Sequence, residues 1–171
     1  MGAVAVGVSG VFHTVASAAA TSPLEVKSVT ASADDGNVPA NTLDNNLSTR
    51  WSSEGDGAWI RYDLGSAQTV GSVLVAWHQG DSRKNTFDVQ LSADGSSWKT
   101  VLERKTSSGG TREQQKYDFA DASARYLRIV GHGNTVSTGP ASPRPTSTEP
   151  TAATTEVRTP SAPSGSRTRT S

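Results

Sequence analysis

The chain has 171 residues, of which 16 are Lys or Arg and 16 are Asp or Glu, so its formal net charge is zero. A chain of this length holds at most one ordinary domain with extensions. The balanced charge gives no support for binding through bulk charge, so no nucleic acid partner is expected. Because the chain contains no Cys, it forms neither a disulfide framework nor a thiolate metal site.

The first 20 residues have the pattern of a secretion signal. An apolar run from Ala3 to Phe12 precedes the small residues ASAAA, which suit cleavage after Ala18 or Ala20. The run is too short and too rich in Gly for a transmembrane helix. No Lys or Arg precedes it, so we expect a signal whose basic start lies further upstream, rather than a disordered tail. The sequence therefore predicts a secreted, extracellular protein.

Residues 27–136 form the candidate globular unit, because they alternate between polar and apolar side chains without a helical period. Asp94-Gly95 is a strong signal for a turn between two strands. Short strands at regular spacing indicate an all-β fold, an antiparallel β-sandwich. The expected strand regions are Val26–Ser32, Ala58–Gly65, Thr69–His78, Thr86–Leu102 (two strands) and Gln115–Gly133.

Four motifs in a fixed order carry a resemblance to a known family. LDNNLSTRW, AWIRYDLG, SADGSSWKTV and ARYLRIVGHGN together resemble the coagulation factor 5/8 type C (discoidin-like) domain over residues 26–137. The bacterial members most similar in pattern are galactose-binding-like carbohydrate-binding modules of secreted polysaccharide lyases and glycosidases. The resemblance implies a β-sandwich jelly roll whose loops at one end hold the ligand. It also implies a non-catalytic module that targets an enzyme to a polysaccharide.

The motif LDNNLSTRW is rich in the acid and amide side chains that offer oxygen ligands to Ca²⁺. In the resembling modules this loop carries a structural Ca²⁺ site, and the positions that carry over are Asp44, Asn46 and Thr49. Asn45 and Asn46 stand where the family often has Gly and Asp, which lowers the charge of the ligand set. The alternative is an Asx-type turn that needs no metal.

Two polar segments are the candidate ligand-binding loops of the resembling fold. Planar polar side chains bond adjacent sugar hydroxyls, and Arg can bind a uronate carboxylate in a bidentate manner. The expected ligand is therefore an acidic polysaccharide such as alginate, or a galactose-type polysaccharide. For each residue alone, an ordinary solvated loop is the alternative. The candidates are His78, Gln79, Asp81, Arg83 and Lys84 in AWHQGDSRKN, and His132 and Asn134 in GHGN.

The four tryptophans are interpreted as packing residues rather than as sugar platforms. Trp51, Trp59 and Trp98 lie within the family motifs, and Trp77 shares a strand face with valines.

Catalysis finds little support in the sequence. The chain has no Gly-x-Ser-x-Gly elbow and no phosphate-binding Gly loop, and Asp81 beside Arg83 is a weak candidate for an acid–base pair. We therefore expect no enzymatic activity on this chain, with a small enzyme as the outside alternative.

A discoidin-type adhesion or lipid-binding domain is the alternative function. The candidate loop tips DDGNVPAN and HQGDSRKN contain no Leu, Phe or Trp, which argues against insertion into a membrane. The module is expected to be monomeric.

Residues 138–171 hold six of the eight prolines and no Lys, Leu, Ile or aromatic residue, so they are predicted to be disordered. The resembling domains need one more strand after GHGN. Reading the codons of Gly139–Pro150 one base earlier permits WASLTEADVYGA, which fits that strand. We therefore expect that a frameshift has removed the last strand, in preference to a native linker.

Overall fold

The computed structural model describes residues 21–136, 147–148 and 150–158. Apart from one short 3-10 helix, η1 (Pro39–Thr42), the regular structure of these residues is β-strand. The described residues include no helix that is long and apolar enough to cross a membrane. The strands are β1 (Thr21–Pro23), β2 (Ser28–Ala31), β3 (Ser53–Glu54), β4 (Trp59–Trp77), β5 (Arg83–Ser92), β6 (Lys99–Thr106), β7 (Gln115–Val136), β8 (Ser147–Thr148) and β9 (Pro150–Arg158).

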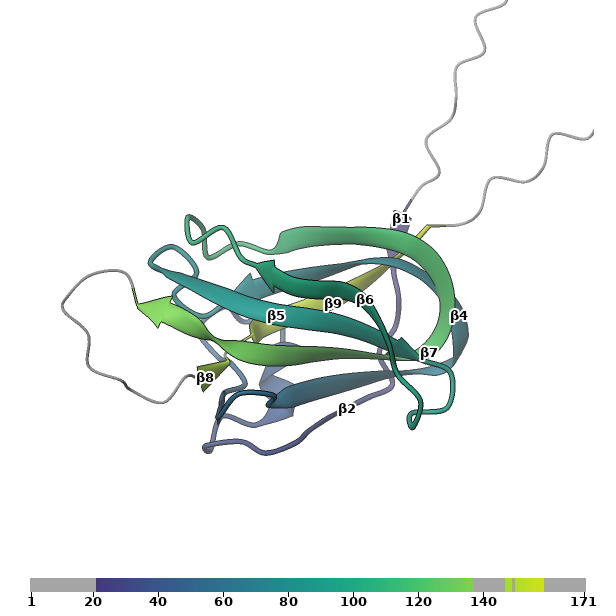
Figure 1. Cartoon of the computed structure of the whole chain (residues 1–171), viewed down its shortest axis with the longest axis horizontal. Coiled ribbons are helices and arrows are strands. Elements are labelled where there is room, and N and C mark those ends of the chain that lie inside the picture. Colours follow the sequence, from purple (N-terminus) through teal and green to yellow (C-terminus); the bar gives the residue numbers. More distant parts are fainter. Residues whose placement is uncertain (1–20, 137–146, 149, 159–171) are drawn as a thin grey trace, which may run out of the picture.

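The long strands β4 and β7 organise the molecule. The main sheet has seven strands in the order β1-β9-β4-β7-β5-β6, with β2 also paired to β4, and every pair is antiparallel. Both long strands curve, so their two halves lie in opposite layers (Figure 1). The predicted all-β, antiparallel fold is confirmed, but hydrogen bonds join the layers into one continuous sheet. A separate two-stranded sheet pairs β3 with β8.

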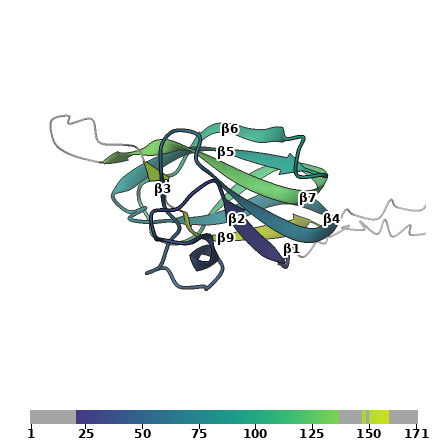
Figure 2. The same ribbon diagram turned by 90° about the horizontal axis from the view of Figure 1, so that it is seen from below.

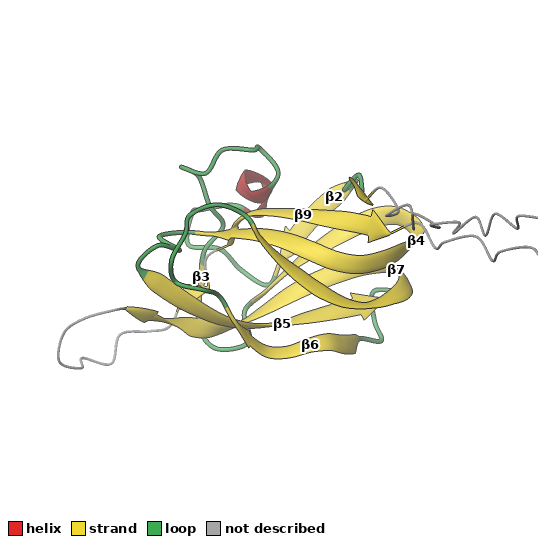
Figure 3. Ribbon diagram, turned by 90° about the horizontal axis from the view of Figure 1, so that it is seen from above, coloured by secondary structure: helices red, strands yellow, loops and turns green. Residues whose placement is uncertain are grey.

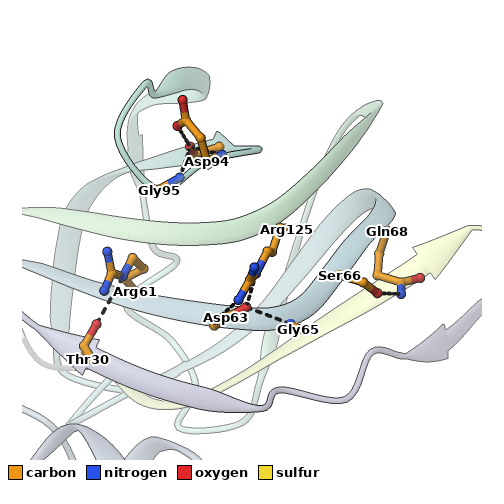
Figure 4. A network of polar contacts seen from close by, with 10 residues as sticks. Thr30, Arg61, Asp63, Gly65, Ser66, Gln68, Asp94, Gly95 and Arg125 are labelled. Carbon is orange, nitrogen blue, oxygen red and sulfur yellow. Dashed lines mark hydrogen bonds and ion pairs between the residues drawn. The ribbon is translucent and has the colours of Figure 1, made fainter.

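The bend of β4 has a local cause between Asp63 and Ser72. The pairing of β4 with β7 is interrupted between Asp63 and Gln68, and again between Val70 and Ser72. Such irregularities bend a strand and increase its twist. At the first interruption Gly65 has φ +81°, and its N–H donates to Asp63 Oδ1 at 2.7 Å (Figure 4). An L side chain would be strained there, so Gly65 permits the bend.

The core lies between the two layers of the bent sheet. Alternate residues of β4, β5 and β7 supply it, as period-2 patterning predicts. Phe87 is central, with its ring centroid 4.8 Å from that of Trp77 and 4.9 Å from that of Tyr117. The fully buried apolar side chains include Trp51, Ile60, Val70, Val73, Val75, Trp77, Phe87, Val89, Leu127 and Ile129.

The four tryptophans divide into two groups. Trp51 and Trp77 are buried, as the sequence predicted. Trp59 and Trp98 are only half-buried, so of the predicted packing residues these two do not belong to the core. Both lie outside the core, and an arginine lies over each ring.

Strand β9 occupies the place where a strand was expected to be missing. It pairs with Ser72–Trp77 of β4 on one side and with β1 on the other. Figures 2 and 3 show η1 outside the sheet, beside β2 and β9. The prediction of disorder is therefore wrong for residues 150–158, and the loss of the native final strand stays a prediction.

The physical reason is that the edge of β4 carries backbone N–H and C=O groups that need partners. An extended segment meets that need through its own backbone, whatever its side chains, and the Thr and Val residues of β9 favour extended conformations. The predicted signal segment 1–20 and the rest of the tail lie outside the described residues. The frameshift stays a prediction.

Candidate functional site

Three connecting segments gather where β4 ends and β5 begins, and we call this region the loop end (residues 43–49, 78–82 and 107–112; Figure 3). A first hollow of about 270 Å³ lies between them. Its lining combines one aliphatic side chain with an imidazole, an amide, a hydroxyl and a guanidinium. The lining residues are Leu47, Ser48, Trp77, His78, Gln79 and Arg112.

The turn after β4 is fixed by its backbone. Gln79 has φ +52°, and its carbonyl oxygen accepts the N–H groups of Ser82 and Arg83 at 2.9 Å each. Gly80 donates to Trp77 O at 2.9 Å, and its carbonyl accepts the N–H of Thr111 at 3.2 Å. A Cβ at Gly80 would lie 2.5 Å from Thr111 O, so only glycine permits this close approach of the two segments. The side chains of the turn are therefore presented from a defined backbone.

An ion pair also joins the two segments. Arg112 Nε lies 2.8 Å from Asp81 Oδ2, with side-chain exposures of 66% and 41%. Exposed pairs of this kind are weak, so the guanidinium can also engage a ligand carboxylate. Beyond the pair lies a second hollow of about 340 Å³, lined by Asp81, Ser82, Lys84, Gly109 and Thr135. The sequence interpretation missed Arg112, because it is separated from Asp81 by 31 residues.

The structure brings together some of the predicted ligand residues. His78 and Gln79 line the first hollow, and Asp81 and Lys84 line the second. The other predicted residues, Arg83 and Asn134, lie in strands rather than in loops: Arg83 pairs with Val136 and Asn134 with the buried Asn85. Both are half-buried.

His132 has a different environment from the one predicted. GHGN continues β7 instead of forming a loop, so that part of the prediction is wrong. A register shift between Asn85 and Phe87 of β5 changes the side-chain alternation here. His132 Nδ1 lies 2.7 Å from Asp56 Oδ1, and Nε2 lies 3.0 Å from Asp88 Oδ2. Its side chain is only 11% exposed.

Burial lowers the pKa of His132, but the two carboxylates raise it by more, so the net pKa is above the ordinary value. The geometry thus shows an imidazole held between two acids. The predicted role of His132 in ligand binding stays a prediction.

The candidate metal loop gathers oxygen atoms around one hydroxyl. Thr49 Oγ1 lies 2.7 Å from Asp44 Oδ2, 2.9 Å from Asn46 O and 3.4 Å from Asn41 O. A hydroxyl donates one proton, so it satisfies only one of these three acceptors. Asp44 Oδ1 accepts the N–H of Asn46 at 2.8 Å, so the expected Asx turn is present as well. Among the described residues, no group of three or more His, Cys, Asp or Glu side chains is placed to hold a metal.

The chain belongs to the F5/8 type C domain family, whose pattern matches residues 23–142. Its fold is similar to that of the CBM32 of AlyQ, solved in complex with 4,5-unsaturated mannuronic acid. That comparison has 44% identity and a TM-score of 0.71, and covers 78% of this chain and 97% of that one. The chain is thus a carbohydrate-binding module like that CBM32, and the predicted resemblance is confirmed.

Two further solved structures extend this result. A truncated AlyQ with CBM32 and alginate lyase domains is 41% identical, with a TM-score of 0.76, over 86% of this chain and 36% of that one. A pectin-binding carbohydrate-binding module shares the fold at 24% identity, with a TM-score of 0.69, over 82% of this chain and 94% of that one. No curated protein matched the chain. The alginate lyase domain belongs to the AlyQ chain.

Proposed function

We propose that the loop end binds an acidic polysaccharide of the polyuronate class, such as alginate. The observation that carries the proposal is the placement of a guanidinium, an imidazole and an amide around one hollow, through Arg112, His78 and Gln79. Lys84 adds a cation at the neighbouring hollow. The similarity to a module solved with an unsaturated mannuronic acid, itself a uronic acid, supports the same ligand class.

In this proposal the side chains have different tasks. Arg112 bonds Asp81 through Nε, which leaves its terminal N–H groups for a carboxylate of the ligand. Asp81 keeps acceptor capacity for a sugar hydroxyl. His78 and Gln79 provide planar polar groups of the kind that bond adjacent hydroxyls, and Leu47 supplies an apolar wall. The chain acts by binding and holds a polysaccharide-degrading enzyme, secreted with it, on its substrate.

Affinity electrophoresis of the full chain tests this proposal. Migration should be retarded in gels containing alginate, with polygalacturonate and galactan gels defining the preferred class. Arg112→Gln and His78→Ala should each weaken binding about tenfold, which corresponds to about 1.4 kcal/mol. Lys105→Gln, a change of an exposed cation on β6, is the charge-matched control, and polymer-free gels correct for mobility. Equal retardation of Arg112→Gln and wild type would contradict the loop-end assignment.

The loop of Asp44 and Thr49 is proposed as a structural Ca²⁺ site, supported by its converging oxygen atoms. Bound Ca²⁺ would fix residues 43–49 and so position Leu47 and Ser48 at the first hollow. Millimolar Ca²⁺ should raise the melting temperature of the wild type and leave that of Asp44→Asn unchanged, as measured by calorimetry with EGTA as the reference. A wild-type melting temperature that is the same in Ca²⁺ and EGTA would leave the Asx turn as the whole explanation.

A lipid-binding role is the second candidate, and one observation favours it. Val38, Leu43 and Leu47 are 44%, 36% and 41% exposed, and all three belong to one segment around η1. The sequence interpretation considered only the loop tips and did not include the two leucines. Sedimentation with phosphatidylserine vesicles distinguishes the two roles, because binding to vesicles but not to polysaccharide would favour the lipid role.

A further inference from the structure

A second group of cations lies away from the loop end, on the outer side of the sheet. We call it the arginine face, and it consists of Trp59, Arg61, Gln90, Trp98, Arg125, Tyr126 and Arg128. All of these side chains are half-buried. They come from β4, β5 and β7 and from the turn before β6, and Figure 4 shows Arg61 beside Thr30 and Arg125 beside Asp63.

Aromatic rings contact all three guanidinium groups, and Arg125 Cζ lies 4.9 Å from the ring centroid of Tyr126. Arg128 Cζ lies 4.1 Å from the ring centroid of Trp98. Arg61 Cζ lies 5.5 Å from that of Tyr126 and 5.8 Å from that of Trp59. A guanidinium held by cation–π contacts still presents its N–H groups at its edges. The rings therefore position the cations instead of serving as open sugar platforms.

The polar partners of these two cations are neutral. Arg128 Nε donates to Gln90 Oε1 at 2.6 Å, and Arg61 Nε donates to Thr30 Oγ1 at 3.2 Å (Figure 4). In residues 21–136, neither guanidinium has a carboxylate within ion-pair distance or a partner for its terminal N–H groups. Arg125 is different, because its Nε and Nη2 each donate to a carboxylate oxygen of Asp63 at 2.9 Å.

The register of the sheet places Arg61 and Arg128, neither of which forms an ion pair within the described residues, side by side. Arg61 of β4 and Arg128 of β7 are direct cross-strand partners. Like charges at directly opposite positions destabilise a sheet. Burial lowers the pKa of Arg128, and the charge of Arg61 lowers it further. An anion bound across both guanidiniums would remove this repulsion.

A hollow adjoins the arginine face. It has a volume of about 300 Å³, and its lining includes Trp98, Ser92, Ser97 and Lys99. Ser92 pairs with Tyr126, and the neighbouring Gln90 pairs with Arg128, so the hollow and the two cations share one region of the sheet. Asp94 also lines the hollow, and its Oδ1 accepts the N–H groups of Ser96 and Ser97 at 2.8 Å each and the hydroxyl of Ser92 at 3.0 Å. With this carboxylate held by its own turn, Lys99 offers a third cation for a sugar that carries an acid group.

We propose that the arginine face is a second binding surface for an acidic polysaccharide. Arg61 and Arg128 bind carboxylates of the polymer, and the hollow beside Trp98 takes a neighbouring sugar. The ligand class rests on the proposed function, but the residues are different. The loop end lies at the Arg83 end of β5 and the hollow beside Trp98 lies at the Ser92 end, and this ten-residue strand spans about 30 Å. A long polymer can contact both surfaces, whereas a short oligosaccharide contacts only one.

The test compares two sets of variants in the full chain. Arg61→Gln/Arg128→Gln should weaken binding to long-chain alginate at least tenfold in isothermal titration, and Arg112→Gln should leave part of that binding in place. Lys105→Gln is the control, because Lys105 pairs with the buried Phe87 and so points to the other side of the sheet. If the double variant does not fold, as judged by its melting curve, Arg128→Lys retains the charge without the planar fork and should still weaken binding.

The tryptophan indole N–H signals identify the surface that is occupied. Trp59 and Trp98 report the arginine face, and Trp77 reports the loop end. Shifts at Trp59 and Trp98 on adding alginate, absent in the arginine variants, would support the arginine face even if Arg112→Gln had no effect. Shifts at Trp77 alone, or wild-type affinity of both the double variant and Arg128→Lys, would overturn it while leaving the loop end intact. Equal shifts with poly-L-glutamate would overturn the assignment to a polysaccharide, as would a wild type that binds neither alginate nor polygalacturonate.

Discussion

The two halves of β4 have different neighbours and depend on different interactions. The first half, Trp59–Asp63, pairs with β2, in which exposed residues alternate with half-buried ones. The second half, Ser72–Trp77, pairs with β9 through six residue positions. The first half contains the buried Tyr62, and the second half pairs with the buried Tyr117 of β7; the hydroxyl of each tyrosine has a polar partner. The comparison shows that the two ends of one strand can pair with neighbours of different kinds. The partner β2 alternates exposed and half-buried residues, whereas β9 lies in a segment without such a pattern.

Of the changes that test this comparison, removal of β9 should lower the stability of the protein most. A chain that ends at Ser137 leaves without partners those N–H and C=O groups of the second half of β4 that face β9, while the pairing with β7 on the other side remains. At about 0.5–1.5 kcal/mol for each backbone hydrogen bond, the loss should be at least about 3 kcal/mol, a large part of a typical stability of about 5–15 kcal/mol. Calorimetry should show a much lower melting temperature or no cooperative transition.

Two further chains serve as references for this experiment. A chain that ends at Arg158 keeps β9 and should melt like the full chain. Replacement of residues 139–171 by WASLTEADVYG tests the predicted frameshift, and a melting temperature above that of the full chain is expected. A stable, cooperative fold without β9 would show that the second half of β4 needs no partner.

The two tyrosine hydroxyls provide a matched pair of smaller changes. Tyr117 accepts the buried N–H of Trp77 at 3.1 Å, so Tyr117→Phe leaves that donor without a partner and should cost about 1–3 kcal/mol. Tyr62 donates to Thr42 Oγ1 at 3.2 Å, and Thr42 itself donates to Pro39 O at 2.9 Å. Tyr62→Phe therefore leaves no buried donor and should cost less than about 1 kcal/mol. Urea denaturation measures both, and a reversed order would contradict this assignment of partners.

A comparably small effect concerns Asp63, where the first half of β4 ends. Its pKa is lowered, chiefly by its hydrogen bonds from Arg125. A lowered folded-state pKa stabilises the protein above the unfolded value of about 3.9, and this contribution is lost as the pH falls through the folded value. Asp63→Asn should cost about 1 kcal/mol at pH 7, and its difference from wild type should shrink below about pH 4. Denaturation at both pH values, with Glu103→Gln as control, checks this, and a constant difference would contradict it.

The strands in which buried and exposed residues alternate could be predicted from the sequence. That two of these strands join into one could not. Ala58–Gly65 and Thr69–His78 were expected as two strands, because Gly65 and Ser66 have the composition of a turn. In the structure they form one bent strand, Trp59–Trp77. The strand β9 was missed for a different reason. Its position depends on the unpaired edge of β4, which no local pattern reveals.

The candidate site was predictable to the extent that it is local in sequence. His78 and Gln79 were identified because polar residues directly after a buried strand must leave the core. Arg112 lies beside them through its contact with Asp81, which is 31 positions away in the sequence. His132 was assigned to ligand binding because GHGN was expected to be a loop, and its contact with Asp56, 76 positions away, could not be anticipated. Contacts between distant segments decide the surroundings of a charged group, and such contacts are absent from a local pattern.

The pairing of β1 with β9 has a consequence for any longer polypeptide that contains this module. Thr21 and Arg158 are direct partners, so the chain enters and leaves the domain at adjacent points. Figure 1 places these points at the end of the molecule away from the turn between β4 and β5. A further domain attached at either point would lie at the end of the module opposite the loop end and would leave the loop end accessible. Such a tether raises the local concentration of that neighbour at the polymer without competing for the binding surface.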